Sequence, residues 1–166
     1  MDEKNRAELT PRQNRLLALK FLLFSISAGV IQIVSYTLLH EFTRLDELTA
    51  LDEIFGNEYG LTYFIALLLS VLWNFTFNRK FTFKSAANVP VAMLKVLAFY
   101  VVFAPLSIWW TVRLTEAGWN EYLVLAMTMI VNFVSEFLYN RFVVYRNDMY
   151  TNEQGRKELE QNGQGK

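Results

Sequence analysis

The residues best suited to chemistry form two asparagine–arginine pairs, each at the end of a long apolar segment. Asn78 precedes Arg79, and Asn140 precedes Arg141. Asn74 lies four residues before Asn78, which puts these two amides on one face of a helix. The planar guanidinium group of arginine presents N–H donors in a geometry that fits phosphate. The pattern therefore predicts a phosphate site at two helix ends, with amides beside it.

Glu136 holds the position before the second pair that Asn74 holds before the first. It is the one charge within its apolar segment, where an aspartate at mid-helix costs about 2.5–3.5 kcal/mol on insertion scales. Ionisable residues in such places are functional by default. We expect Glu136 to hold a hydroxyl group of a ligand, to carry a coupled proton or to form a structural ion pair, and the sequence leaves these three open.

Further polar residues extend this set along the apolar segments. Asn132 lies one helical turn before Glu136, and Gln32 lies inside the first segment. Gln32 would either line a polar path in the bundle or belong to the packing face of its helix. Asn132 would either extend that path or make a hydrogen bond between helices. Lys20 and Lys95 stand at the start of the first and third segments and would add positive charge to a phosphate site. The alternative is that the basic side chains only extend to the membrane–water interface and determine the orientation of the helices.

The composition excludes several classes of function. The chain of 166 residues has no cysteine and one histidine, which argues against a disulfide framework, a zinc ribbon, a thiol nucleophile and a metal site. Its seven glycines form no loop of the kind that cradles nucleotide phosphates. We therefore expect a protein that is not an enzyme, with no cofactor, no metal and no nucleic-acid partner.

The elements that must position these residues follow from the distribution of apolar side chains. Apolar residues make up 53% of the chain and charged residues 19%, and the charges lie almost wholly between apolar blocks. About twenty helical residues cross a hydrocarbon core of roughly 30 Å. In the first block, Ser25 and Gly29 form a small-xxx-small pair that predicts close helix contact. The blocks predict an all-α membrane protein with four transmembrane helices, at about residues 18–39, 61–79, 93–113 and 122–141.

Basic residues are distributed unevenly among the segments that connect these helices. Of the 16 lysines and arginines, all but Arg44 and Arg113 lie in the two termini or the middle connection. The positive-inside rule then places both termini and the middle connection in the cytoplasm. We expect a cytoplasmic tail over residues 1–15, a membrane domain over 16–147 and, because of its polar composition, a disordered cytoplasmic tail over 148–166.

The ends of the second and fourth apolar segments match each other. Residues 74–84 read N-F-T-F-N-R-K-F-T-F-K, and residues 136–146 read E-F-L-Y-N-R-F-V-V-Y-R. Both halves start and finish on the same side, so the match predicts two helical hairpin repeats of the same orientation. A pseudo-two-fold axis along the membrane normal would relate them and bring both asparagine–arginine pairs to one cytoplasmic rim.

The order and spacing of these motifs resemble the GtrA-like family of small four-span membrane proteins. The likeness covers about residues 15–147 and includes Lys20–Phe21, Gly29 and the pattern N-F-x-x-N-R-x-x-x-F from Asn74 to Phe83. It continues with K-V-L-A-F-Y at the start of the third segment and N-R-F-V-V-Y at the end of the fourth. The sequence departs from the family at Glu136, where a neutral residue is common, and in its long acidic first connection.

The resemblance implies a role in cell-surface polysaccharide synthesis at the inner membrane. It implies the translocation, or flipping, of a polyprenyl-phosphate-linked sugar such as undecaprenyl-phosphate-glucose. An alternative is a non-catalytic membrane partner or anchor of a glycosyltransferase, since related four-span modules occur fused to such enzymes. A third reading, a small-solute proton antiporter with Glu136 as its proton site, requires that residue deeper in the membrane. Membrane lipids, a glycosyltransferase and a second copy of the chain are the expected partners.

Overall fold

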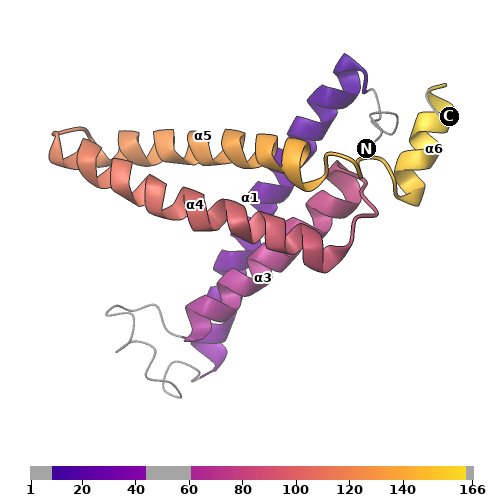
Figure 1. Ribbon diagram of the computed structural model, residues 1–166. Helices are drawn as coiled ribbons and strands as arrows, with labels where there is room; N and C mark the ends of the chain where they lie inside the picture. The colour runs from indigo at the N-terminus through magenta and orange to yellow at the C-terminus, as the bar shows by residue number, and fades with distance from the viewer. Residues whose placement is uncertain (1–8, 44–60, 164–166) are drawn as a thin grey trace. The chain divides into compact units, whose positions relative to one another are not determined.

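The computed structural model describes residues 9–43 and 61–163, and every regular element in these ranges is helical (Figure 1). Four of the helices are long and apolar enough to cross a membrane, which confirms the predicted all-α membrane protein with four transmembrane helices. The α-helices are α1 (Pro11–Phe42), α3 (Leu61–Phe77), α4 (Val89–Glu116), α5 (Glu121–Tyr139) and α6 (Glu153–Gln161). Two π-helical turns, η3 (Asn78–Thr82) and η4 (Asn140–Val144), continue α3 and α5 directly.

The helices begin at capping residues rather than at the first apolar residue. Before α1, the Thr10 backbone N–H donates to Gln13 Oε1 (2.7 Å) and the Gln13 N–H donates to Thr10 Oγ1 (3.3 Å), which is a capping box. At the starts of α4 and α5, the Asn88 and Asn120 side chains accept hydrogen bonds from backbone N–H groups of the first turn. For this reason α1 and α4 start well before the apolar blocks from which their spans were predicted.

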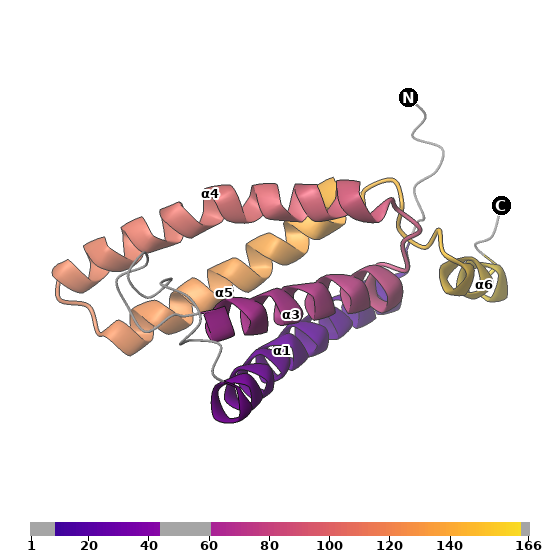
Figure 2. The same cartoon turned by 90° about the horizontal axis from the view of Figure 1, so that it is seen from below.

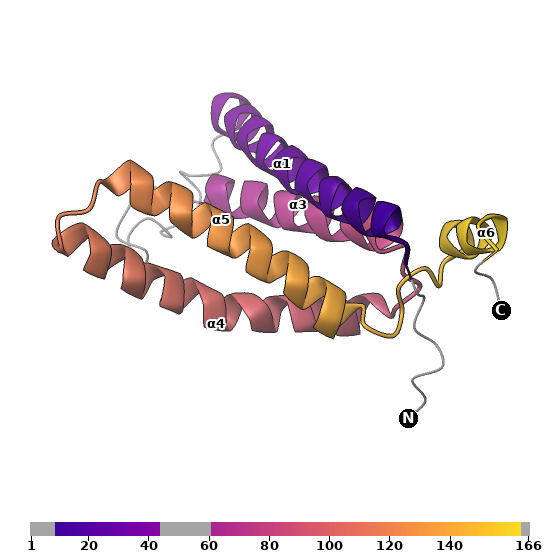
Figure 3. The same cartoon turned by 90° about the horizontal axis from the view of Figure 1, so that it is seen from above.

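The chain forms two compact units, and the first, Leu19–Thr82, holds most of α1 together with α3 and η3. Ser25 Oγ lies 3.4 Å from Asn74 Oδ1, and Trp73 Nε1 donates to Ser27 Oγ (3.0 Å). The rings of Tyr36 and Tyr63 meet near the other end of the pair, so the two helices run antiparallel, side by side in Figures 2 and 3.

The small-xxx-small pair of α1 does not form the predicted contact. A Cβ built on Gly29 meets nothing within 4 Å, and its place on the helix is exposed. The hydroxyl groups of Ser25 and Ser27 make the contacts with α3 instead. In this unit, hydrogen bonds between polar side chains and not close backbone approach join the helices.

The second unit comprises Met1–Ala18 and Phe83–Lys166 and is built on α4 and α5. Trp110 Nε1 donates to Thr128 Oγ1 (2.9 Å), and the ring centroids of Phe99 and Tyr139 lie 5.3 Å apart. Phe99 and Tyr139 join early α4 to late α5, and Trp110 and Thr128 join late α4 to early α5, so this pair is also antiparallel. The turn between the two helices requires the positive φ of 86° at Gly118. Whether the two pairs are repeats of one another stays a prediction.

The predicted disorder of the C-terminal tail is wrong for residues 148–163. The Tyr150 N–H donates to the Phe83 carbonyl (2.9 Å), and the Asn152 N–H donates to the Lys84 carbonyl (2.9 Å). Lys84, which is buried, forms an ion pair with Glu158 of α6. The composition of this segment is typical of disorder, but composition carries no information about hydrogen bonds to a segment more than sixty residues earlier.

Gly155 allows α6 to approach this turn closely. A Cβ on Gly155 would lie 2.5 Å from the Cα of Tyr150, and Tyr150 itself has a positive φ of 58°. Burial, together with the negative charge of Glu158, raises the pKa of Tyr150 to about 12. The turn is therefore a packed structure with a neutral tyrosine at its centre.

Replacing Gly155 by alanine should displace α6. The added methyl group would meet backbone atoms, and overpacking of this kind costs roughly 1–3 kcal/mol. We expect hydrogen–deuterium exchange of the α6 amides to accelerate about tenfold or more. Gly29→Ala is the matched control and should leave exchange in α1 unchanged or slower; equal, unaltered α6 exchange in both variants would contradict the packing described here.

Candidate functional site

Both asparagine–arginine pairs lie in π-helical turns. η3 begins at Asn78 and η4 begins at Asn140, which are equivalent positions of the two matching sequence segments. In η4 the Tyr145 N–H reaches back five residues to the Asn140 carbonyl (2.8 Å), as a π-turn requires. Such turns are rare and occur frequently at functional sites. The sequence match did not indicate this geometry, although it predicted which residues share it.

The amides of the first unit form a chain of hydrogen bonds along α3 and η3. Asn78 Nδ2 donates to Asn74 Oδ1 (2.7 Å), and Thr82 Oγ1 donates to Asn78 Oδ1 (2.8 Å). Asn74 and Asn78 therefore share one face, as predicted, but they bind each other. Their arrangement supports the π-turn that carries Arg79, whose side chain is half-buried.

Two other predicted residues lie on α1 in the same unit. Ser70 Oγ of α3 donates to Gln32 Oε1 (3.5 Å), so Gln32 lies at the contact between the two helices, in agreement with the packing alternative. Lys20 is half-buried on α1. The first unit thus holds Lys20, Gln32, Asn74, Asn78 and Arg79 of the predicted site.

Glu136 lies between α5 and α4, and its side chain is 6% exposed. Its carboxylate forms a hydrogen bond with the Tyr100 hydroxyl of α4, and the same hydroxyl bonds the Asn132 side chain. Asn132 Oδ1 is buried without a hydrogen-bond partner among the described residues. Tyr100 was not among the predicted residues, because a hydroxyl-bearing side chain within an apolar helix was its only signal in the sequence.

Arg141 is held by the N-terminal end of α1. Its Nη2 donates to Asn14 Oδ1 (2.6 Å), while its Nε is buried and has no partner within the described ranges. Asn140, the other member of the pair, donates from Nδ2 to the Glu136 carbonyl (3.0 Å). Asn14 was also missed, since a polar residue in the first turn of a helix is too common to indicate a role.

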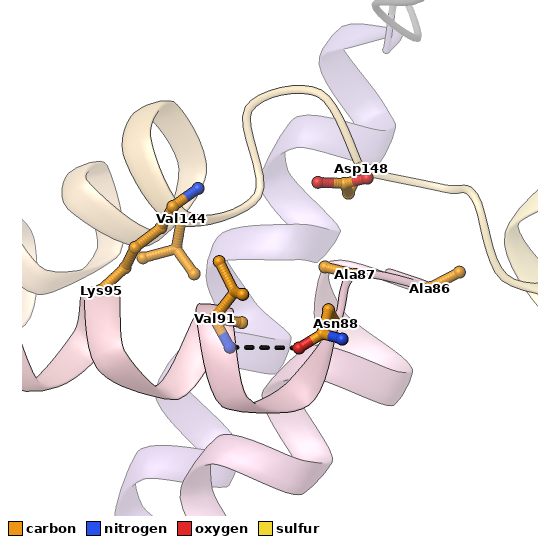
Figure 4. A pocket seen from close by; sticks show the side chains of 8 residues that line it. Ala86, Ala87, Asn88, Val91, Lys95, Val144 and Asp148 are labelled. Carbon is orange, nitrogen blue, oxygen red and sulfur yellow. Dashed lines mark hydrogen bonds between the residues drawn. The ribbon is translucent and has the colours of Figure 1, made fainter.

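Lys95 lies apart from these groups, on the wall of a hollow of about 310 Å³ at the start of α4 (Figure 4). The second unit therefore holds Asn132, Glu136, Asn140, Arg141 and Lys95 of the predicted site. In the described part of the chain, no group of histidine, aspartate and glutamate side chains could hold a metal ion.

Comparison with known families identifies the chain. The sequence pattern of the GtrA/DPMS transmembrane domain matches residues 20–145. The chain belongs to this family. The match confirms the resemblance and places the chain among multi-pass membrane proteins of polyprenyl-phosphate sugar translocation or synthesis. No curated protein and no solved structure matches it.

The contact between Tyr100 and Glu136 can be tested with a double-mutant cycle. Tyr100→Phe leaves a buried carboxylate without its donor, which should destabilise the protein by about 1–3 kcal/mol. In a Glu136→Leu background the same change should destabilise the protein much less, because the effects of substitutions at two contacting residues on stability are not additive. Thermal unfolding in detergent measures both effects, and Tyr122→Phe, at an exposed tyrosine of α5, is the control. Additive effects would contradict the hydrogen bond.

Proposed function

We propose that this GtrA/DPMS protein moves a polyprenyl-phosphate-linked sugar, such as undecaprenyl-phosphate-glucose, across the inner membrane. The observation that carries the proposal is the arrangement at the end of α5. There a buried carboxylate, Glu136, and an arginine, Arg141, lie within about one and a half helical turns of each other. A sugar phosphate needs an acceptor for its hydroxyl groups and a cation for its phosphate, and one helix end presents both.

The phosphate is assigned to Arg141. Asn14 takes one N–H of the guanidinium group and fixes the direction of the side chain, and the buried Nε lacks a partner among the described residues. A donor that is out of water without a partner loses hydrogen-bond energy that a ligand would return. Arginine donors pair especially well with phosphate oxygens. Arg79, in the equivalent π-turn of the first unit, is proposed for the same role.

Glu136 is assigned to the sugar. An ionised carboxylate has about four acceptor positions, and Tyr100 occupies one of them. The other positions can accept hydroxyl groups of a sugar that passes between α4 and α5. In its absence the hydrogen bond with Tyr100 reduces the cost of keeping the carboxylate inside the apolar helices.

Leaflet exchange of the lipid in liposomes tests this function. Purified protein should accelerate exchange of a polyprenyl-phosphate-glucose above the rate in empty liposomes. Arg141→Gln should slow it about tenfold or more, because hydrogen bonds to charged groups contribute about 1.5–3 kcal/mol. Arg113→Gln is the matched control, since Arg113 lies at the opposite end of α4 in an exposed pair with Glu116 (3.5 Å). Equal rates in both variants would refute the role of Arg141.

A partner or anchor of a glycosyltransferase is the second candidate, and α6 favours it. This helix is ordered, charged and joined to the membrane helices by Lys84 and Glu158, so it offers a surface for another protein. If wild-type protein exchanges lipid no faster than empty liposomes, the autonomous translocase is refuted. Increased activity of a co-reconstituted glycosyltransferase would then support the partner role.

The orientation is proposed from the positive-inside rule, with both termini in the cytoplasm. The absence of cysteine makes it directly testable, because a single introduced cysteine is the only thiol. Gln161→Cys, at the end of α6, should react only with a membrane-permeant maleimide in intact cells. Ala117→Cys, between α4 and α5, should react with an impermeant one. The reverse labelling pattern would overturn the orientation.

A further inference from the structure

The hollow at the start of α4 has two walls of opposite charge. One wall is α4 itself, with Val91, Ala92 and Lys95, and the other is the segment after η4, with Asp148 (Figure 4). Neither the Lys95 ammonium nor the Asp148 carboxylate makes an ion pair or a side-chain hydrogen bond with any residue in 9–43 or 61–163. Both groups are half-buried. Two opposite charges thus line one hollow without neutralising each other.

Hydrogen bonds fix these two walls relative to each other. Thr151 Oγ1 donates to the Asp148 carbonyl (2.7 Å) and accepts from the Ala86 N–H (2.9 Å), which ties the segment after η4 to the loop before α4. The hydrogen bonds of Tyr150 and Asn152 with residues 83 and 84 reinforce this tie. The position of Asp148 beside the start of α4 is therefore fixed by the backbone of this turn.

Three backbone N–H groups near the hollow are already occupied. The Val91 N–H donates to Asn88 Oδ1 (3.3 Å), the Ala92 N–H to the Asn88 carbonyl (3.0 Å) and the Ala87 N–H to Ser85 Oγ (3.0 Å). Pro90 has no N–H to offer. The start of α4 is thus poorly suited to bind an anion by itself, and the charge available to an anion in the hollow is that of Lys95.

The position of the hollow indicates where its ligand comes from. α4 has 28 residues, whereas about twenty suffice to cross the hydrocarbon core, and its uncharged run begins only after Lys95. We therefore place its first turns in the head-group layer. Basic side chains beside a transmembrane helix bind lipid head groups. The volume of about 310 Å³ is at the lower end of the roughly 300–1,000 Å³ of ligand pockets, which suits a head group.

We propose that this hollow binds the phosphate-bearing head group of a membrane lipid. Lys95 holds the phosphate, and Asp148 accepts hydrogen bonds from a donor group on the far side of that phosphate. Two lipids share this chemistry: phosphatidylethanolamine, whose donor is an ammonium group, and a polyprenyl-phosphate sugar, whose donors are hydroxyl groups. Only in the second case does the site rest on the proposed function.

Lipid titration of the purified full-length chain, followed by native mass spectrometry, tests the site. Phosphatidylethanolamine and polyprenyl-phosphate-glucose form the two arms. Phosphatidylcholine, which has a phosphate but no hydrogen-bond donor, is the reference lipid. At least one arm should bind about tenfold more tightly than phosphatidylcholine, and the arm that does identifies the source of the head group. Equal binding of all three lipids would overturn the proposal.

Variants assign the two roles. Lys95→Gln should weaken the favoured lipid about tenfold, and Asp148→Asn should remove its advantage over phosphatidylcholine, since charge-assisted hydrogen bonds contribute about that much. Lys157→Gln and Glu160→Gln, at exposed positions of α6, are the charge-matched controls and should bind as wild type. Wild-type binding by both hollow variants would refute the site.

Two further measurements separate the test of this site from the folding of the variants and from the test of the proposed translocase. If a variant does not fold, the wild-type chain is used instead, and free phosphoethanolamine or glucose 1-phosphate is added to compete with lipid binding. A complete lack of competition by both compounds refutes the site. If lipid exchange depends on Arg141 but the protein shows no head-group selectivity, this inference is overturned and the proposed function is not. Selective binding of phosphatidylethanolamine in a protein that exchanges no lipid supports the hollow while refuting the translocase.

Discussion

A polar group inside a bilayer finds no water, so its partner must come from the protein itself. The backbone meets this requirement by forming helices, and the side chains meet it in pairs between neighbouring helices. Glu136 with Tyr100 and Trp110 with Thr128 are such pairs between α5 and α4. Each pair specifies which faces of two apolar helices meet, a choice that apolar contact alone leaves nearly neutral because lipid tails are equally apolar.

At the ends of α3 and α5 the helical geometry itself changes. Both η3 and η4 are π-turns that begin at an asparagine and carry an arginine at their second residue. Their buried asparagines bond within the same helix, Asn78 to Asn74 and Asn140 to the Glu136 carbonyl. A charged group at such a place can be partly dehydrated and still meet a lipid phosphate, which links the folding constraint to the proposed function.

The sequence predicted the four transmembrane helices because hydrophobic length is a local property that needs no knowledge of contacts. It also predicted the two asparagine–arginine pairs and the shared face of Asn74 and Asn78. It missed Tyr100 and Asn14, since a single hydroxyl or amide in a helix carries no sign of its distant partner. The close contact predicted at Gly29 was wrong for a related reason: a small residue permits an approach without requiring it.

The sequence by itself thus indicated the class of protein, and the resemblance of its motifs indicated the family. Tertiary structure decided the partner of Glu136, the direction of Arg141 and the order of residues 148–163. The C-terminal segment shows the physical reason. Its polar residues cannot form a core of their own, and it becomes ordered only because Phe83 and Lys84 supply carbonyl groups and a buried ammonium group to it.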